Sequence, residues 1–84
     1  MLFRSPAERK LAAERQALES LTAKERAIVR LIAEGKSNAE VGNALHLSPR
    51  TVETYRGRLM QKLQLEDIVG LVKFAIRHGM AALE

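Results

Sequence analysis

The sequence predicts an all-α fold, in which four packed helices follow one additional helix near the N-terminus. Three features support this prediction. Signals that start a helix recur along the chain, apolar residues recur three or four positions apart, and no segment alternates apolar and polar residues as a strand does. A chain of 84 residues has room for one small domain of this kind.

Each of five segments begins with a residue whose side chain can cap a helix: Ser5, Thr22, Ser37, Ser48 and Asp67. The segments "SPAE", "TAKE" and "SNAE" also have a glutamate three residues later, which completes a capping box. Pro49 suits the first position of its helix, and Gly35 and Gly79 are typical helix ends. The expected helices are 6–20, 23–34, 38–45, 49–63 and 68–78.

Apolar residues on one side of the middle three helices predict a single core. These residues are Ile28, Val29, Leu31, Ile32, Val41, Ala44, Leu45, Val52, Tyr55, Leu59 and Leu63. The first helix has only a thin stripe, formed by Ala7, Leu11, Leu18 and Leu21 and interrupted by Glu14. Residues 1–20 are therefore expected to be a linker or an appended helix, and residues 21–80 the domain.

The composition permits a polyanionic partner and excludes some other classes of protein. The formal net charge is +4, and residues 35–63 hold five cations against two anions. The chain has no cysteine for disulfides or thiolate metal sites. It also lacks an apolar run of the roughly 20 residues that a membrane span requires, and its first residues do not resemble a secretory signal. We therefore expect a cytoplasmic protein without a membrane partner.

The helix expected at 49–63 has an unusual outer face. At about 100° per residue, that face carries Arg50, Glu53, Thr54, Gly57, Arg58 and Gln61. Glycine inside a helix costs roughly 1 kcal/mol relative to alanine, but it lets the backbone approach another surface closely. A major groove about 12 Å wide accepts such a helix. Ordinary solvated surface can also be polar and arginine-rich, so this helix alone leaves both interpretations open.

The order of the elements favours DNA binding. A short helix, the turn "LHLSPR" and a longer basic helix form a helix-turn-helix arrangement. The motifs "LT..E", "L.AEGKSN.E", "V...L.LS..TV..Y", "LM.KL" and "LVKFAIRHGM" match in register. Over residues 21–80 the chain resembles the LuxR/FixJ-type (GerE-like) DNA-binding domain of bacterial transcription regulators. Gln64 replaces the glycine that often ends the recognition helix in that family, and Gly42 replaces an alanine, which is expected to loosen helix 38–45.

The resemblance implies that helix 49–63 enters the major groove of duplex DNA. Base-reading positions then fall on Glu53, Thr54, Gly57, Arg50 and Arg58. Contacts to the DNA backbone fall on Ser37, Asn38, Thr51, Tyr55, Arg56 and Lys62. For Arg56, an ion pair with Glu25 is an equally good expectation.

The last expected helix is apolar on nearly every side. This pattern fits either a wide core face or an exposed interface. The resemblance favours an interface between two copies, with Val69, Val72, Lys73 and Ile76 as the candidates. A two-fold homodimer on DNA would bind a pseudo-palindromic site.

Other functions have weaker support in the sequence. No nucleophile–base pair or phosphate-binding loop is present, so neither an enzyme nor a cofactor is expected. His46 and His78 each lie beside a helix end and are expected to be surface or capping residues, not metal ligands. The alternative function is a small helical interaction module that docks an acidic protein.

The sequence is compatible with two positions of the domain within a regulator. The resemblance implies a stand-alone regulator or the output domain of a two-component response regulator, with RNA polymerase as a further candidate partner. Residues 81–84 are expected to be a tail or an expression scar.

Overall fold

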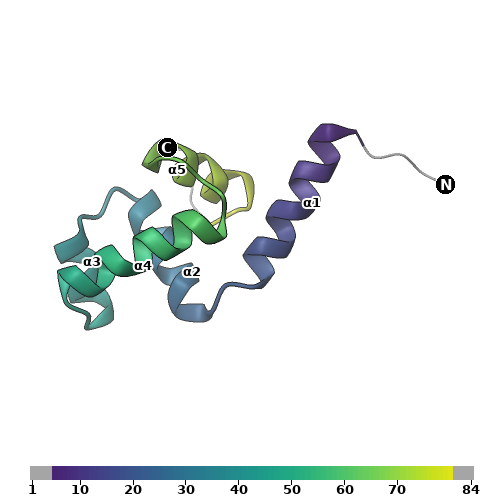
Figure 1. The fold of residues 1–84 in the computed structure, drawn as a ribbon. Helices are drawn as coiled ribbons and strands as arrows, with labels where there is room; N and C mark the ends of the chain where they lie inside the picture. Colours follow the sequence, from purple (N-terminus) through teal and green to yellow (C-terminus); the bar gives the residue numbers. More distant parts are fainter. Residues whose placement is uncertain (1–4, 81–84) are drawn as a thin grey trace.

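A computed structural model describes residues 5–80 and contains five α-helices and no strand within that range (Figure 1). The helices are α1 (Pro6–Glu19), α2 (Ala23–Ala33), α3 (Asn38–Leu45), α4 (Pro49–Lys62) and α5 (Ile68–Arg77). The all-α prediction is confirmed, and each helix begins at the expected residue. None of the helices in the described range is long and apolar enough to cross a membrane. The expected tail, residues 81–84, lies outside the described residues.

The helix starts depend on local capping, as the sequence predicts. Thr22 and Ser37 form complete capping boxes, in which the Thr22 N–H donates to Glu25 Oε1 at 2.8 Å. Ser48 and Asp67 accept hydrogen bonds from the N–H groups three residues later. At Ser5 the described structure has the first bond of the box, from the Glu8 N–H, without the return bond. Each of these bonds satisfies a helix N–H that has no partner within the helix.

Helix α4 ends without the glycine that is frequent at this point. Gln64 adopts the left-handed conformation instead, with φ 55°. The Leu65 N–H then donates to the Met60 carbonyl at 2.8 Å, which closes the last turn as a glycine would allow. A side chain in this conformation costs about 1–2 kcal/mol. The helix therefore ends at its expected place, and the substitution is absorbed as local strain.

Gly42 permits close packing between α3 and the turn that follows it. A Cβ atom at this position would collide with the carbonyl oxygen of Leu47, and the Leu47 N–H donates to the Gly42 carbonyl at 2.8 Å. The structure thus gives Gly42 a role different from the expected loosening of α3. It holds the turn against the helix that precedes it.

One apolar core joins helices α2 to α5. Its buried members are Leu21, Ile28, Val29, Ile32, Val41, Val52, Leu59, Leu63, Leu71, Phe74 and Ala75. Leu31, Leu45 and Tyr55 are half-buried against it. The prediction for Ala44 was wrong, because this residue is exposed. The packed side of α3 is centred on Val41, Gly42 and Leu45, and Ala44 points away from it.

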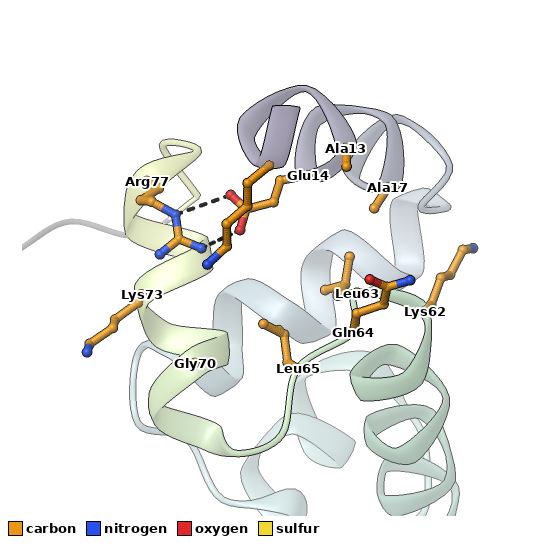
Figure 2. Close-up of a pocket in the computed structure, with 11 residues that line it drawn as sticks. Ala13, Glu14, Ala17, Lys62, Leu63, Gln64, Leu65, Gly70, Lys73 and Arg77 are labelled. Atoms are coloured by element: carbon orange, nitrogen blue, oxygen red, sulfur yellow. Dashed lines mark hydrogen bonds and ion pairs between the residues drawn. The ribbon is translucent and has the colours of Figure 1, made fainter. Parts of the chain in front are cut away.

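Glu14 corrects the expectation for α1. It does not interrupt the packed stripe, since it is itself buried, with an exposed fraction of 8%. Arg77 Nη2 lies 2.6 Å from Glu14 Oε2, and a 2.9 Å hydrogen bond joins His78 Nε2 to Glu14 Oε1 (Figure 2 shows the arginine contact). Burial raises the pKa of Glu14, but hydrogen bonds from Arg77 and His78 outweigh it and hold that pKa below its ordinary value.

His78 was expected to be a surface or capping residue, and only the second part is confirmed. It caps the end of α5, but its side chain is buried, with an exposed fraction of 6%. Its ring also lies 4.6 Å from the Phe74 ring, between centroids. Within residues 5–80, no group of three acidic, histidine or cysteine side chains could hold a metal ion.

Candidate nucleic-acid interface

Helices α3 and α4 form a helix-turn-helix at one end of the molecule. Figure 1 shows α3 and the first turns of α4 at the end of the body far from the start of α1. His46, in the left-handed conformation with φ 59°, ends α3 and reverses the chain direction. Val41 on α3 and Val52 on α4 are fully buried between the two helices and the core. This packing fixes the orientation of α4.

Helix α4 has one buried side and one polar side in solvent. Val52, Leu59 and Leu63 face the core. The predicted base-reading residues are all exposed: Arg50, Glu53, Thr54, Gly57 and Arg58. Together with the exposed Gln61, they define what we call the α4 strip. The fold thus places every predicted base-reading residue on one accessible face.

Gly57 lies in the middle of the α4 strip, at a position where the fold does not require glycine. A Cβ atom built at this residue would meet nothing within 4 Å, and its φ lies outside the left-handed region. Intramolecular packing therefore does not explain a residue that weakens the helix by about 1 kcal/mol relative to alanine. The α4 backbone is consequently bare at the centre of its polar face.

A shallow hollow of about 520 Å³ lies beside the first half of the α4 strip. Its lining consists of Asn38, Pro49, Arg50, Glu53 and Thr54. The Thr54 hydroxyl donates to the Arg50 carbonyl at 3.2 Å, so its methyl group and oxygen lone pairs stay available. Pro49 was not among the predicted site residues, although its position at the first turn of α4 indicated that it would border this face.

The predicted DNA-backbone residues divide into three groups, of which the first is Asn38 with Arg56. Arg56 and Asn38 bind each other, since Arg56 Nη1 donates to Asn38 Oδ1 at 2.8 Å across α4 and α3. The alternative pairing of Arg56 with Glu25 was wrong. The described structure places Arg56 near the start of α3 instead, and Glu25 is occupied by Lys62. The Asn38–Arg56 bond therefore fixes the distance between the two helices of the motif.

Lys62 is already engaged within the protein. Its Nζ lies 3.2 Å from Glu25 Oε1 and donates to the Ser20 carbonyl at 3.0 Å, although 37% of the side chain is exposed. The Thr22 N–H is the main cause that lowers the pKa of Glu25, and Lys62 adds to that effect against the opposing effect of burial. A contact between Lys62 and DNA would compete with this ion pair.

Of the other three predicted backbone residues, Ser37 caps the start of α3, and Thr51 and Tyr55 lie in α4. The Ser37 hydroxyl accepts from the Glu40 N–H, and the Thr51 hydroxyl is 2.9 Å from the Ser48 hydroxyl. Tyr55 is half-buried against the core. The Ser37 and Thr51 hydroxyls therefore lie at the helix starts of α3 and α4, among the capping groups.

Helix α5 presents an outward apolar face on the opposite side from its core residues. Leu71, Phe74 and Ala75 are buried, whereas Val69 has an exposed fraction of 60%. Lys73 is also exposed, and Val72 and Ile76 are half-buried. The core therefore does not cover every apolar side of α5, because Val69 lies outside it.

Comparison with known proteins agrees with this arrangement. The family model described as "Bacterial regulatory proteins, luxR family" matches residues 19–75, which include α2 to α4 and most of α5. The chain belongs to the LuxR family. It therefore carries the DNA-binding regulator domain of that family, which is not a class of enzymes. Its helix-turn-helix is the α3–α4 unit, and the resemblance inferred from the sequence motifs is confirmed.

Several LuxR-family relatives show substantial identity. The chain is 44% identical over 63 residues to an uncharacterized response regulatory protein, YgeK, of Escherichia coli K12. It is 37% identical over 68 residues to the DNA-binding transcriptional activator EvgA of the same strain, and 38% identical over 64 residues to the transcriptional regulatory protein MctR of Rhizobium johnstonii. The matched regions cover 75%, 81% and 76% of this chain, but only 43%, 33% and 30% of the relatives.

Proposed function

We propose that this LuxR-family domain binds duplex DNA at specific sequences, with α4 in the major groove. The exposed, side-chain-free centre of the α4 strip is the observation that carries this proposal, because nothing inside the protein requires Gly57. A helix of this width fits the groove, which is about 12 Å wide. The name of EvgA, a DNA-binding transcriptional activator, supports the same function for the matched region.

The residues of the α4 strip would have different roles. Arg50 and Arg58 can donate to guanine edges or phosphates, Glu53 can accept from a cytosine amine, and the Thr54 methyl can contact thymine. Asn38 and Arg56, bonded at 2.8 Å, would hold α3 at the DNA backbone while α4 lies in the groove. Ser37, Thr51, Tyr55 and Lys62 are the other proposed backbone contacts. Phosphate contacts position the domain, and base contacts specify the sequence.

We further propose that residues 21–80 are the DNA-binding domain and residues 1–20 a linker to other parts of a regulator. The longer relatives include a response regulatory protein, which supports a role as the output domain of a two-component response regulator. Two copies would pair through the α5 face, defined as Val69, Val72, Lys73 and Ile76, on a pseudo-palindromic site. A contact with RNA polymerase would follow for a regulator of transcription.

Selection of duplexes from a random pool, followed by electrophoretic mobility shift titrations, tests the main proposal. We expect a selected duplex to bind more tightly than a random duplex, and binding to both to weaken steeply as salt rises, because phosphate contacts release counterions. If every duplex binds more weakly than micromolar at low salt, the DNA-binding proposal is wrong. The basic helix would then be examined against an acidic protein partner.

Two variants separate base contacts from phosphate contacts. Thr54→Ala is expected to change the preferred base at one position by about 1–3 kcal/mol and to leave random duplexes nearly unaffected. Lys62→Ala should weaken binding to all duplexes alike and reduce the salt dependence. Binding titrations of both variants on selected and random duplexes measure these effects. Equal losses from both variants on every duplex would contradict the assigned geometry.

Glu25→Gln is the matched control for Lys62. Glutamine can keep the capping box with Thr22 but removes the charge that pairs with Lys62 at 3.2 Å. This variant leaves Lys62 with the hydrogen bond to the Ser20 carbonyl but without the ion pair, so it should bind all duplexes at least as tightly as the natural sequence. Weaker binding by Glu25→Gln would show that the ion pair itself supports the interface.

Val69→Glu tests pairing through the α5 face. The exposed fraction of 60% at Val69 means that the charge can be solvated in a single copy, so the domain should stay folded by circular dichroism. Across a two-fold axis, however, the two glutamates would repel each other. We expect normal affinity for a single half-site and a loss of cooperativity on a double site, measured by titrating both duplexes.

The same measurement gives the outcomes that would contradict this prediction. Unchanged cooperativity in the folded Val69→Glu variant would place the contact between copies elsewhere on the domain. Lower affinity for the single half-site would instead mean that α5 affects DNA binding directly. Lys73→Gln, another change on the exposed α5 face, would show whether charge there has a general effect.

A further inference from the structure

Helix α1 contacts the rest of the domain through its second half, which holds Glu14, Ala17 and Leu18. In α1, as far as the structure describes it, Glu14 is the only buried side chain, and the remaining residues are exposed or half-buried. Leu11, on the apolar stripe, is 39% exposed. A separate helix of 14 residues is marginally stable in water. Ala17 and Leu18 are partly buried against the core, and Arg26 Nη2 donates to the Leu18 carbonyl at 3.0 Å, so these contacts hold the end of α1 together with those of Glu14.

Both oxygens of Glu14 bind residues at the end of α5. Arg77 donates through Nη2 to Oε2 at 2.6 Å and through Nε to Oε1 at 3.2 Å, and His78 Nε2 lies 2.9 Å from Oε1. His78 in turn packs on the fully buried Phe74. Bidentate arginine–carboxylate bonds are among the stronger polar contacts. Glu14, Arg77 and His78, which we call the Glu14 latch, thus connect α1 to the core of the domain.

The surface around the Glu14 latch is a groove of about 330 Å³ between α1, the end of α4 and α5 (Figure 2). Ala13 and Ala17 of α1 line this groove together with Gly70 of α5. These residues are small, and Leu63 and Leu65 complete the apolar part of the lining. Lys10, Lys62 and Lys73 also line the groove, so its rim carries several positive charges. The Glu14 latch is therefore the polar part of the attachment of α1, beside the partly buried Ala17 and Leu18.

We propose that the Glu14 latch docks α1 as a separately releasable helix, and that the docked helix limits access to the α5 face. The second part rests on the proposed pairing of two copies. Lys73 connects the two surfaces, because it lines the groove beside α1 and also belongs to the α5 face. At about 100° per residue, Arg77 and Gly70 lie directly beside Lys73 on α5. A second copy that approaches Val69 would therefore meet docked α1 at the edge of the contact.

Hydrogen exchange without DNA tests the latch. Glu14→Gln keeps the size of the side chain but removes the charge, so we expect the amides of residues 10–19 to exchange at least tenfold faster. The amides of α2 to α5 should change less than twofold. Glu19→Gln, an exposed residue of the same helix, is the matched control and should leave all rates within twofold.

Two outcomes would overturn the latch. If residues 10–19 exchange equally fast in the natural sequence and in Glu14→Gln, Glu14 does not hold α1. If α2 to α5 accelerate together with α1, the helix is part of the cooperative core and cannot be released separately. A double variant with Arg77→Gln adds a check, because residues of one cluster are non-additive. It should exchange no more than twofold faster than Glu14→Gln alone.

Titrations on single and double DNA half-sites test the second part of the proposal. Release of α1 in Glu14→Gln should leave single-site affinity unchanged and increase cooperativity on the double site at least threefold. Unchanged or lower cooperativity, with α1 shown to be released, would mean that α1 does not limit the α5 face. Failure of both the natural sequence and the variant to bind any duplex would instead refute the DNA-binding proposal, while the exchange result for the latch would stand.

Discussion

Phe74→Ala is expected to lower the free energy of unfolding by about 3–5 kcal/mol, because it removes a large side chain from the centre of the core. Phe74 is fully buried and belongs to the cluster that joins α2, α3, α4 and α5. Domains of this size are stable by roughly 0.05–0.15 kcal/mol per residue. The variant should therefore lose a large part of its stability, and its Tm should fall by about 20 °C.

Thermal and urea unfolding followed by circular dichroism measure this effect. Phe74→Leu is the matched control, since it keeps most of the apolar volume and should cost less than half as much. Val69→Ala, on the exposed side of the same helix, should stay within about 0.5 kcal/mol of the natural sequence. A loss below about 1 kcal/mol for Phe74→Ala would mean that α5 is not packed on α2 as the structure shows.

The sequence predicts most of the fold because its helix signals are local. Thr22 with Glu25, and Ser37 with Glu40, need only the spacing of three residues to form their capping boxes, and both are present in the structure. The repeat of apolar residues likewise identifies the core side of α4. Interactions of this kind depend on neighbours within one or two turns, so they can be inferred before the fold is known.

Long-range polar contacts could not be inferred in the same way. Glu14 binds Arg77 and His78, which lie 63 and 64 residues further along the chain, and nothing in the α1 sequence identifies these partners. The sequence therefore predicts that Glu14 interrupts the stripe of α1, whereas in the structure it is the buried residue of that helix. The pairing of Lys62 with Glu25, which the Arg56 alternative missed, has the same explanation.

The candidate site could be predicted from the sequence only in part. The positions of the α4 strip follow from helical geometry, and all of the predicted base-reading residues are exposed as expected. The backbone contacts depend on how α3 crosses α4, so the bond between Asn38 and Arg56 was not predicted. Local periodicity can thus define a surface, but the side chains that are free to bind on it depend on tertiary contacts.

Gly57→Leu is expected to stabilise the free domain and to weaken its binding to DNA. Leucine suits a helix interior better than glycine by about 0.8–1 kcal/mol, and the space around Gly57 is open, so the free domain gains stability. In the major groove, however, the new side chain would displace the α4 backbone from the bases. A loss of one or two base contacts amounts to about 3 kcal/mol, or roughly 100-fold in affinity.

Opposite signs in the two measurements make this variant decisive. Unfolding of the free domain should shift to higher temperature, while fluorescence anisotropy with a selected duplex should show the weaker binding. Gly57→Ala is the matched control, because it gives a similar gain in stability with a much smaller side chain and should lose less affinity. Unchanged affinity in Gly57→Leu would show that the middle of α4 is not at the DNA contact. Loss of stability in the free domain would instead mean that the fold requires Gly57. The glycine would then not be evidence for a DNA contact.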